Sequence, residues 1–246
     1  AAFIHADEVS APDIPAEERA NISISQLLRE GQSLLVQVTK DPIGSKGARL
    51  TTNLSLPSRY LVLMPGAEHI GISQRIEDQE ERERLKALMQ TLLEQEERID
   101  GYGYILRTVA EGATEVELKA DIAFLHRLWN KVQARIKESK APANVYEDLP
   151  LNMRALRDMT HSGIERIRID SRETYQKALS FANTLVPEIE SKLEYYPGER
   201  PIFDMFNVEE EMQRALGRKI ELKSGGYLIF DQTEAMTTVD INTGAF

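Results

Sequence analysis

A carboxylate and a carboxamide lie two residues apart near the end of the chain, in the segment Thr238-Val-Asp-Ile-Asn. Successive side chains of a β-strand point to opposite faces, so Asp240 and Asn242 are expected on one face together with Thr238. Val239 and Ile241 are then expected to point into the core. An acid at a strand end suits Mg²⁺, which is usually bound through one or two carboxylates and keeps several waters. Asn242 is spaced to hydrogen-bond Asp240 and fix its rotamer. The alternative is an ordinary polar strand edge, which the spacing alone favours.

The sequence gives little sign of cysteine chemistry, histidine metal sites or nucleotide binding. The 246 residues contain no cysteine, which excludes disulfides, thiolate metal clusters and a cysteine nucleophile. The four histidines have no helical spacing for a shared metal and are expected to be surface or satisfied residues: His5, His69, His126 and His161. Gly101-Tyr-Gly-Tyr is too short for a nucleotide fingerprint and there is no phosphate loop, so neither ATP nor NAD is implied.

The charge balance is acidic, with 30 basic against 40 acidic side chains and a net charge of −10. Such a field repels anions at long range. Between Arg29 and Arg75, however, six basic residues stand against three acidic ones, so a local anion site is compatible with the sequence. No run reaches the roughly 20 apolar residues of a membrane span, and we expect a soluble, cytoplasmic chain.

The elements that must position these residues follow from apolar periodicity and turn signals. Apolar residues recur at helical spacing in 77–98 and in 115–139, and both stripes are expected to pack. Further helices are expected at 151–159, 172–185 and 207–216, the last with Asn207 and Glu210 as a capping box. Strands are expected at 33–40, 49–56, 60–64, 101–108, 164–170, 219–222, 227–231 and 236–241. This order predicts an α+β, multi-domain chain whose first part resembles a small β-barrel.

Several motifs along the whole chain resemble those of the ribonuclease E/G family. The matching segments are Lys46-Gly-Ala-Arg-Leu-Thr-Thr, Leu61-Val-Leu-Met-Pro-Gly, Gly71-Ile-Ser-Gln-Arg-Ile-Glu, Ile105-Leu-Arg-Thr, Lys192-Leu-Glu-Tyr-Tyr and Leu222-Lys-Ser-Gly-Gly-Tyr-Leu-Ile-Phe-Asp-Gln-Thr-Glu-Ala-Met-Thr-Thr-Val-Asp-Ile-Asn-Thr-Gly. The resemblance implies a Mg²⁺-dependent endoribonuclease that cuts single-stranded RNA, such as rRNA precursors and mRNA, and prefers 5′-monophosphorylated ends. It also implies four parts: a partial OB-fold RNA-binding barrel (1–52), a 5′-sensor domain (53–152), a ribonuclease H-like subdomain (153–216) and the start of a DNase I-like catalytic domain (217–246).

The resemblance also assigns roles to single residues. Asp240 matches a metal-binding aspartate and Asn242 the asparagine that orients it. Arg107 and Thr108 match the pair that holds a 5′-monophosphate, and the backbone of Val62 matches a position that completes that pocket. RNA-binding candidates are Phe3, as a stacking aromatic, with Lys40, Lys46 and, more weakly, Arg75. Without the resemblance, we would expect Arg107 to pair with a carboxylate such as Glu111. Phe3 would likewise be expected in the core.

The resemblance further implies that the family's second metal-binding aspartate and its zinc-binding cysteine pair lie beyond Phe246, and that part of the ribonuclease H-like fold precedes the barrel. We therefore expect this chain alone to be inactive, and the full-length form to be a homodimer or higher homo-oligomer. The rival interpretation is a non-catalytic module that binds RNA 5′ ends or scaffolds an assembly. A third is an unrelated α+β protein with a fortuitous strand motif, which the length of the resemblance disfavours.

Overall fold

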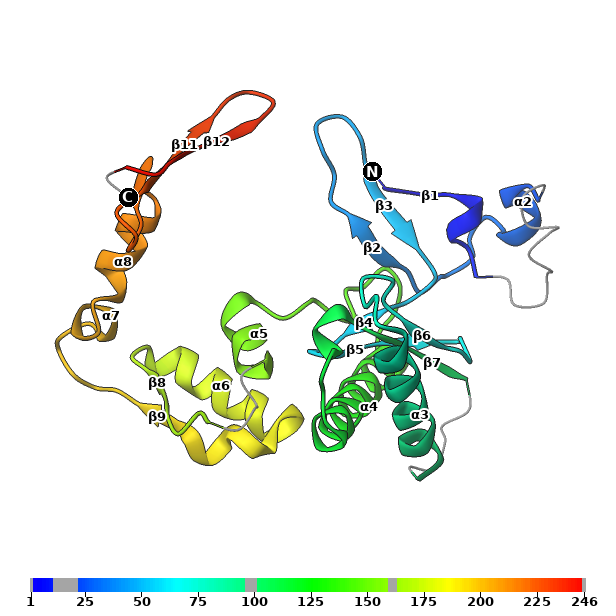
Figure 1. The fold of residues 1–246 in the computed structure, drawn as a ribbon. Coiled ribbons are helices and arrows are strands. Elements are labelled where there is room, and N and C mark those ends of the chain that lie inside the picture. Colours follow the sequence, from blue (N-terminus) through cyan, green and yellow to red (C-terminus); the bar gives the residue numbers. More distant parts are fainter. Residues whose placement is uncertain (1, 11–21, 96–100, 159–162, 245–246) are drawn as a thin grey trace. The chain divides into compact units, whose positions relative to one another are not determined.

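The fold was analysed in a computed structural model that describes residues 2–10, 22–95, 101–158 and 163–244. The chain divides into two compact units. The first contains residues 1–165 and 178–191, and the second contains residues 166–177 and 192–246. Each unit is described by itself. Figure 1 shows a chain of mixed α and β structure with several small sheets, as the sequence predicts.

The first unit begins with a three-stranded sheet of order β1-β3-β2. Strand β1 (Ala2–Ile4) is parallel to β3 (Ala48–Thr51), which is antiparallel to β2 (Gln37–Lys40). Two short helical turns, η1 (Ala6–Glu8) and α2 (Ile24–Leu27), lie between β1 and β2 in the chain. The strand expected at 33–40 is shorter than predicted, because only residues 37–40 pair with a neighbouring strand among the described residues. The one expected at 49–56 splits into β3 and β4 (Leu56–Pro57).

A four-stranded sheet of order β4-β5-β7-β6 forms the centre of this unit. Strand β5 (Leu61–Pro65) is antiparallel to both β4 and β7 (Tyr102–Leu106), and β6 (Ile70–Ile72) is parallel to β7. Helices α3 (Gln79–Gln95) and α4 (Glu115–Glu138) contact each other, and they contact β6 and β4–β5 respectively. Figure 1 shows both helices packed against this sheet. The result is a two-layer α/β arrangement whose core lies between helices and sheet.

Both predicted helical stripes are buried. Leu85, Met89 and Leu92 of α3 have no exposed surface, and neither have Leu118, Ile122 and Leu125 of α4. Helix α4 begins at a capping box, in which Thr114 accepts a hydrogen bond from the Glu117 amide and Glu117 accepts one from the Thr114 amide. The unit also contains the short turn η2 (Thr108–Ala110) and helix α5 (Leu151–Asp158).

The second unit contains two small sheets. Strand β8 (Ile167–Ile169) is parallel to β9 (Leu193–Tyr195). Between them lie α6 (Arg172–Leu185) and η3 (Pro187–Lys192), each with part of its length in the first unit. Helices α7 (Ile202–Met205) and α8 (Val208–Ala215) lead to an antiparallel sheet of β10 (Lys219–Glu221), β11 (Tyr227–Gln232) and β12 (Thr237–Asn242). These last three strands lie within one or two residues of their predicted bounds.

The predicted capping box of α8 is wrong. Asn207 has a left-handed backbone, with φ of 56°, and its side chain makes no capping hydrogen bond. A capping residue normally has an extended backbone, from which its side chain reaches the amides of the first turn. Asparagine instead tolerates the left-handed region, and here it serves as a turn before the helix.

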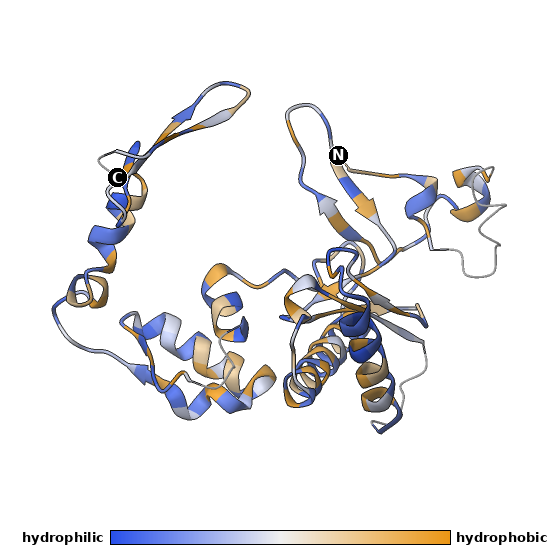
Figure 2. Cartoon of the chain, in the orientation of Figure 1, coloured by the Kyte–Doolittle hydropathy of each residue, from blue (hydrophilic) through white to orange (hydrophobic). Residues whose placement is uncertain are grey.

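The expected burial of Val239 and Ile241 is also wrong. Their exposed fractions are 47% and 72%, so this face of β12 is open to solvent at both residues. Figure 2 shows hydrophilic and hydrophobic residues mixed along β11 and β12. The period of two therefore identifies which side chains share a face of β12, but not whether that face is covered. None of the described helices combines the length and apolarity that crossing a membrane requires.

Candidate functional site

Arg107 and Thr108 lie directly after β7, where the chain enters the turn η2. The Arg107 guanidinium donates hydrogen bonds through Nη1 to the backbone oxygens of Ser58 and Arg59. Its own amide donates to the Tyr60 oxygen at 2.8 Å. All side-chain bonds of Arg107 within the described chain therefore use one nitrogen and neutral carbonyls. The alternative pairing with Glu111 is not found among the described residues.

Thr108 meets a residue that sequence reasoning did not single out. Its hydroxyl lies 3.0 Å from the hydroxyl of Ser73, which follows β6. Ser73 is held there by its amide, which donates to the Leu106 oxygen at 2.8 Å, and by Arg82, which donates to the Ser73 oxygen at 2.8 Å. The amide of Arg75 donates to the Ser73 hydroxyl at 3.4 Å. The parallel pairing of β6 and β7 thus brings Ser73 and Arg75 beside the Arg107–Thr108 pair.

This group of residues, Ser73, Arg75, Arg107 and Thr108, is called here the β7-end cluster. It offers two hydroxyls and two guanidinium groups without a carboxylate bonded to them among the described residues. Guanidinium and hydroxyl donors are suited to the oxygens of a phosphate. Val62 lies in β5 opposite Ile105, one strand away from the cluster. The arrangement has the chemistry of a site for a small phosphate group.

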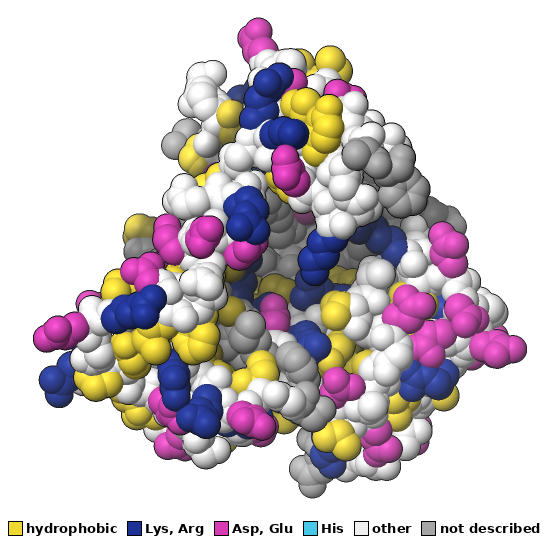
Figure 3. All heavy atoms as spheres, turned by 60° about the vertical axis from the view of Figure 1, so that its left-hand side comes forward, with side chains coloured by type: hydrophobic (Ala, Val, Ile, Leu, Met, Phe, Trp, Pro, Cys, Tyr) yellow, Lys and Arg dark blue, Asp and Glu magenta, His cyan; other side chains and the backbone are white. Residues whose placement is uncertain are grey.

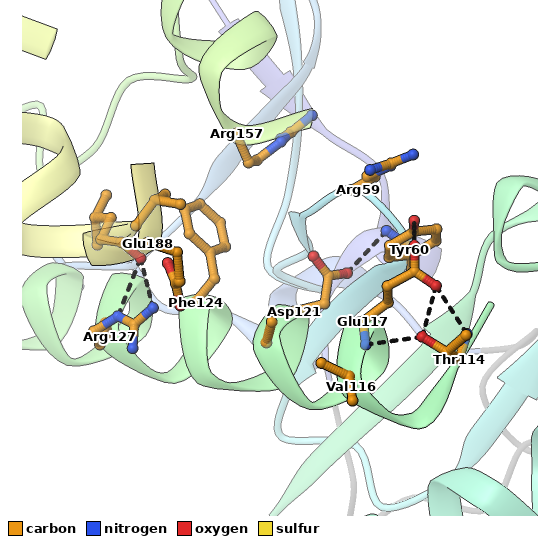
Figure 4. A pocket seen from close by; sticks show the side chains of 13 residues that line it. Arg59, Tyr60, Thr114, Val116, Glu117, Asp121, Phe124, Arg127, Arg157 and Glu188 are labelled. Carbon is orange, nitrogen blue, oxygen red and sulfur yellow. Dashed lines mark hydrogen bonds between the residues drawn. The ribbon is translucent and has the colours of Figure 1, made fainter. Parts of the chain in front are cut away.

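A pocket of about 600 Å³ lies in the first unit between α4 and the turn that precedes β5 (Figure 4). Asp121 and Glu117 point from α4 toward this turn. The phenol of Tyr60 donates to Glu117 at 2.7 Å, while Asp121 accepts bonds from the amides of Tyr60 and Leu61. Burial raises the pKa of Asp121, and these hydrogen bonds oppose the rise. Asp121 is only 7% exposed, and the apolar stripe of α4 gave no signal for it.

A second group of predicted residues meets on the first sheet. Phe3 pairs with Arg49 across β1 and β3, and Lys40 pairs with Arg49 across β2 and β3. Cross-strand partners share a face, so an aromatic and two basic side chains form one row. Phe3 is 48% exposed, which disagrees with its alternative interpretation as a core residue. Lys46 is exposed in the loop between β2 and β3. Arg49 was not selected from the sequence, because its place in the row depends on strand register.

Asp240 and Asn242 lie on β12, with Asp240 opposite Ile229 of β11. The Asn242 side chain donates to one oxygen of Asp240 at 3.1 Å. The other oxygen accepts no hydrogen bond within the described chain, and the side chain is exposed. Asp231 shares this face, but Arg218 donates to both of its oxygens, at 2.6 and 3.0 Å. The described residues contain no group of three acidic or histidine side chains around a common point.

One carboxylate held by a carboxamide fits Mg²⁺, since this ion is commonly bound by one or two carboxylates and completed by water. Asp240 would hold it and Asn242 would orient Asp240. Figure 3 shows acidic and basic side chains interspersed on the face in view.

The chain belongs to a known family of ribonucleases. Residues 55–246 match the Ribonuclease E/G family, and relatives at more than 30% identity align with the whole chain. Ribonuclease G of Escherichia coli strain K12 is 54% identical over 100% of this chain and 50% of its own length. Ribonuclease G of Haemophilus influenzae is 47% identical over the same shares. Ribonuclease E of a Nostoc species is 34% identical over 99% of this chain and 35% of its own length. The chain thus spans about half the length of the ribonuclease G relatives.

Proposed function

We propose that this chain is part of an endoribonuclease that cleaves single-stranded RNA and prefers substrates with a 5′-monophosphate. The β7-end cluster supports the preference for this end. A terminal monophosphate carries more charge and more free oxygens than an internal phosphodiester, and the Arg107 fork with the Thr108 and Ser73 hydroxyls matches those oxygens. We assign phosphate binding to Arg107 and Thr108, a backbone contact to Val62, and a weaker contact to Arg75.

The proposed path of the RNA crosses the first sheet. An exposed aromatic gives a base a surface for stacking, and basic side chains beside it attract the backbone. Phe3 and Lys40 meet both conditions in one row with Arg49. Lys46 extends the basic surface from the adjacent loop. We retain the partial OB-fold barrel (1–52), the 5′-sensor (53–152), the ribonuclease H-like part (153–216) and the catalytic start (217–246) as the proposed division of the chain.

Cleavage is proposed at Asp240. Mg²⁺ bound there would polarise a scissile phosphate and lower the pKa of a water molecule. Asp240 would hold the ion through its exposed carboxylate, and Asn242 restricts the rotamer of Asp240 by its 3.1 Å hydrogen bond. Family membership supports these roles, and it is also the basis for proposing rRNA precursors and mRNA as substrates, a homo-oligomer and a cytoplasmic location. The zinc site that family membership suggests uses a cysteine pair, and this sequence contains no cysteine.

A second function is a receptor for RNA 5′ ends that does not cut RNA itself. The observation in its favour is that Asp231, an acid on the same face of the sheet, is paired with Arg218, and that no group of three acidic or histidine side chains surrounds Asp240 among the described residues. In this interpretation the β7-end cluster and the Phe3 row account for the whole activity of the chain. We expect the chain of 246 residues alone to bind RNA and not to cleave it.

The preference for the 5′ end is tested by RNA binding. Two oligonucleotides of identical sequence, one with a 5′-monophosphate and one with a 5′-hydroxyl, are titrated against the chain. The measured quantity is the Kd for the 5′-hydroxyl RNA divided by the Kd for the 5′-monophosphate RNA. Arg107→Ala should reduce this ratio at least about tenfold, because a charge-assisted bond contributes roughly 1.5–3 kcal/mol. The control is Arg135→Ala, an exposed arginine on α4. Equal losses for both oligonucleotides would refute a terminal-phosphate site.

Cleavage is tested in a polypeptide extended to the full length of the relatives. Asp240→Asn should abolish Mg²⁺-dependent turnover while RNA binding persists, because the carboxylate and not the RNA-binding surface is changed. Glu234→Gln removes an acid from the turn of the same hairpin and serves as the control. Full turnover of the Asp240 variant would exclude Asp240 as the metal ligand. Binding without any cleavage by the unchanged full-length polypeptide would favour the receptor.

A further inference from the structure

Asp121 is a buried acid that neither phosphate binding nor cleavage uses directly. It lies on α4 one turn after Glu117, with 7% of its surface exposed. One of its oxygens accepts hydrogen bonds from the Ser58 hydroxyl, from the Tyr60 amide at 2.8 Å and from the Leu61 amide at 2.9 Å. A buried carboxylate is costly unless such donors compensate it. Asp121 therefore stabilises the turn 58–61 through these hydrogen bonds.

The same turn holds Arg107 from its other side. The Arg59 oxygen accepts from the guanidinium, and the next amide along the chain, that of Tyr60, donates to Asp121. These two groups belong to one peptide unit. The Tyr60 oxygen likewise accepts from the Arg107 amide, and the Leu61 amide donates to Asp121. Two successive peptide units thus lie between the acid and the arginine.

Because each peptide unit is planar, a hydrogen bond at its N–H also fixes the direction of its C=O. The N–H and C=O of a trans peptide point in opposite directions, so an anion at the N–H end and a cation at the C=O end both favour the same orientation. Hydrogen bonds in such a chain polarise and strengthen one another. Asp121 thereby fixes the carbonyl oxygens that orient Arg107. A direct ion pair would occupy the guanidinium fork, whereas this indirect link engages only Nη1 and leaves Nε and Nη2 to a ligand.

We propose that Asp121 is a positioning residue of the phosphate site: through the peptide units of residues 59–61 it orients the Arg107 guanidinium toward the terminal phosphate of the RNA. This role rests on the proposed function of the β7-end cluster. Glu117 supports the same turn through the phenol of Tyr60, at 2.7 Å. Figure 4 shows the two acids side by side on α4, facing Tyr60.

The test measures discrimination between RNA ends rather than affinity. Asp121→Asn replaces one acceptor oxygen by an amide donor and removes the charge. It should lower the ratio of Kd values for 5′-hydroxyl over 5′-monophosphate RNA by about threefold to tenfold, as expected from one weakened charge-assisted bond. The Nε–H resonance of Arg107 should shift in the ¹H–¹⁵N spectrum. Glu115→Gln removes an exposed acid from the same helix and should preserve both the ratio and the resonance.

A general loss of stability would affect both oligonucleotides equally and would leave their ratio at the parent value. That result, together with a reduced ratio in Arg107→Ala, would overturn the role of Asp121 but not the phosphate site. If Arg107→Ala had the same ratio of Kd values as the unchanged protein, both the phosphate site and the positioning role would be refuted. If Asp121→Asn does not fold, as judged by circular dichroism, Ser58→Ala decides. This variant removes one bond to Asp121, so a lowered ratio supports the role and an unchanged ratio overturns it.

Discussion

The acid of Glu117 shows how one side chain couples a helix end to the turn before β5. Its oxygens accept hydrogen bonds from the Thr114 amide at 2.9 Å, the Thr114 hydroxyl at 2.8 Å and the Tyr60 phenol at 2.7 Å. The bond from the Thr114 backbone and the bonds from Tyr60 and Thr114 side chains lower the pKa of Glu117 to about 2. Burial, with the bond to Glu117, raises the pKa of Tyr60 to about 12. The ionised acid and the neutral phenol are thus the stable pair.

This pair predicts a pH dependence for Glu117→Gln. A folded pKa below the ordinary value of 4.5 means that ionised Glu117 stabilises the fold fully above that pH and loses this effect as the pH falls toward about 2. The variant should lower the free energy of unfolding by about 1 kcal/mol at neutral pH, as for a lost cap. Urea unfolding at pH 7 and pH 3 measures the difference from the parent, which should shrink at the lower pH. A difference independent of pH, or the same change in Glu115→Gln, would contradict the assignment.

At the scale of elements, α4 is the longest helix of the described residues and carries both a packing stripe and the two acids. Leu125 is fully buried in the stripe, whereas Val116 on the same helix is 77% exposed. Leu125→Ala should therefore lower the free energy of unfolding by about 2–5 kcal/mol, the range for a buried leucine. Val116→Ala should change it by less than about 0.5 kcal/mol, as is usual at exposed positions. Equal losses in chemical unfolding would mean that α4 does not pack by this stripe.

Helices with strong periodicity were predictable because one face of each meets the core. The predicted range 172–185 coincides with α6, and 115–139 differs from α4 by one residue. Strands β6 and β9, of three residues each, were not predicted from the sequence. Gly103 shows a further limit. A Cβ there would lie 2.8 Å from the Ala67 side chain, so this glycine serves close packing, a role that its sequence neighbours do not reveal.

The candidate site was predictable where a motif is local and not where it depends on register. Arg107 and Thr108 are adjacent in the sequence, and Asp240 and Asn242 are two residues apart. Ser73 joins the first pair only because β6 runs parallel to β7. Asp121 is separated in the sequence by about 60 residues from the turn that donates hydrogen bonds to it. An acidic residue between the apolar positions of a helix is also expected to be exposed, so the sequence does not reveal its burial.

At the scale of the whole molecule, a net charge of −10 coexists with a proposed RNA surface. The two are compatible because exposed charges farther apart than about 8–10 Å are largely screened at physiological ionic strength. Contacts with RNA phosphates then depend on nearby basic side chains. We propose that the row on the first sheet supplies such contacts through Lys40, since Arg49 in the same row is paired with Glu8 at 2.7 Å. Stacking and charge in this row should respond differently to salt.

Two variants separate these contributions. Lys40→Gln should reduce the slope of log K against log salt for a single-stranded RNA by about 0.7, the change expected for one lost phosphate contact. Phe3→Ala should weaken binding by about 1–3 kcal/mol at every salt concentration, because stacking releases no counterions. Fluorescence anisotropy at several salt concentrations measures both, with Lys86→Gln on α3 as the control for total charge. If Lys86→Gln lowered the slope as much as Lys40→Gln, the net charge rather than the row on the first sheet would govern the encounter with RNA.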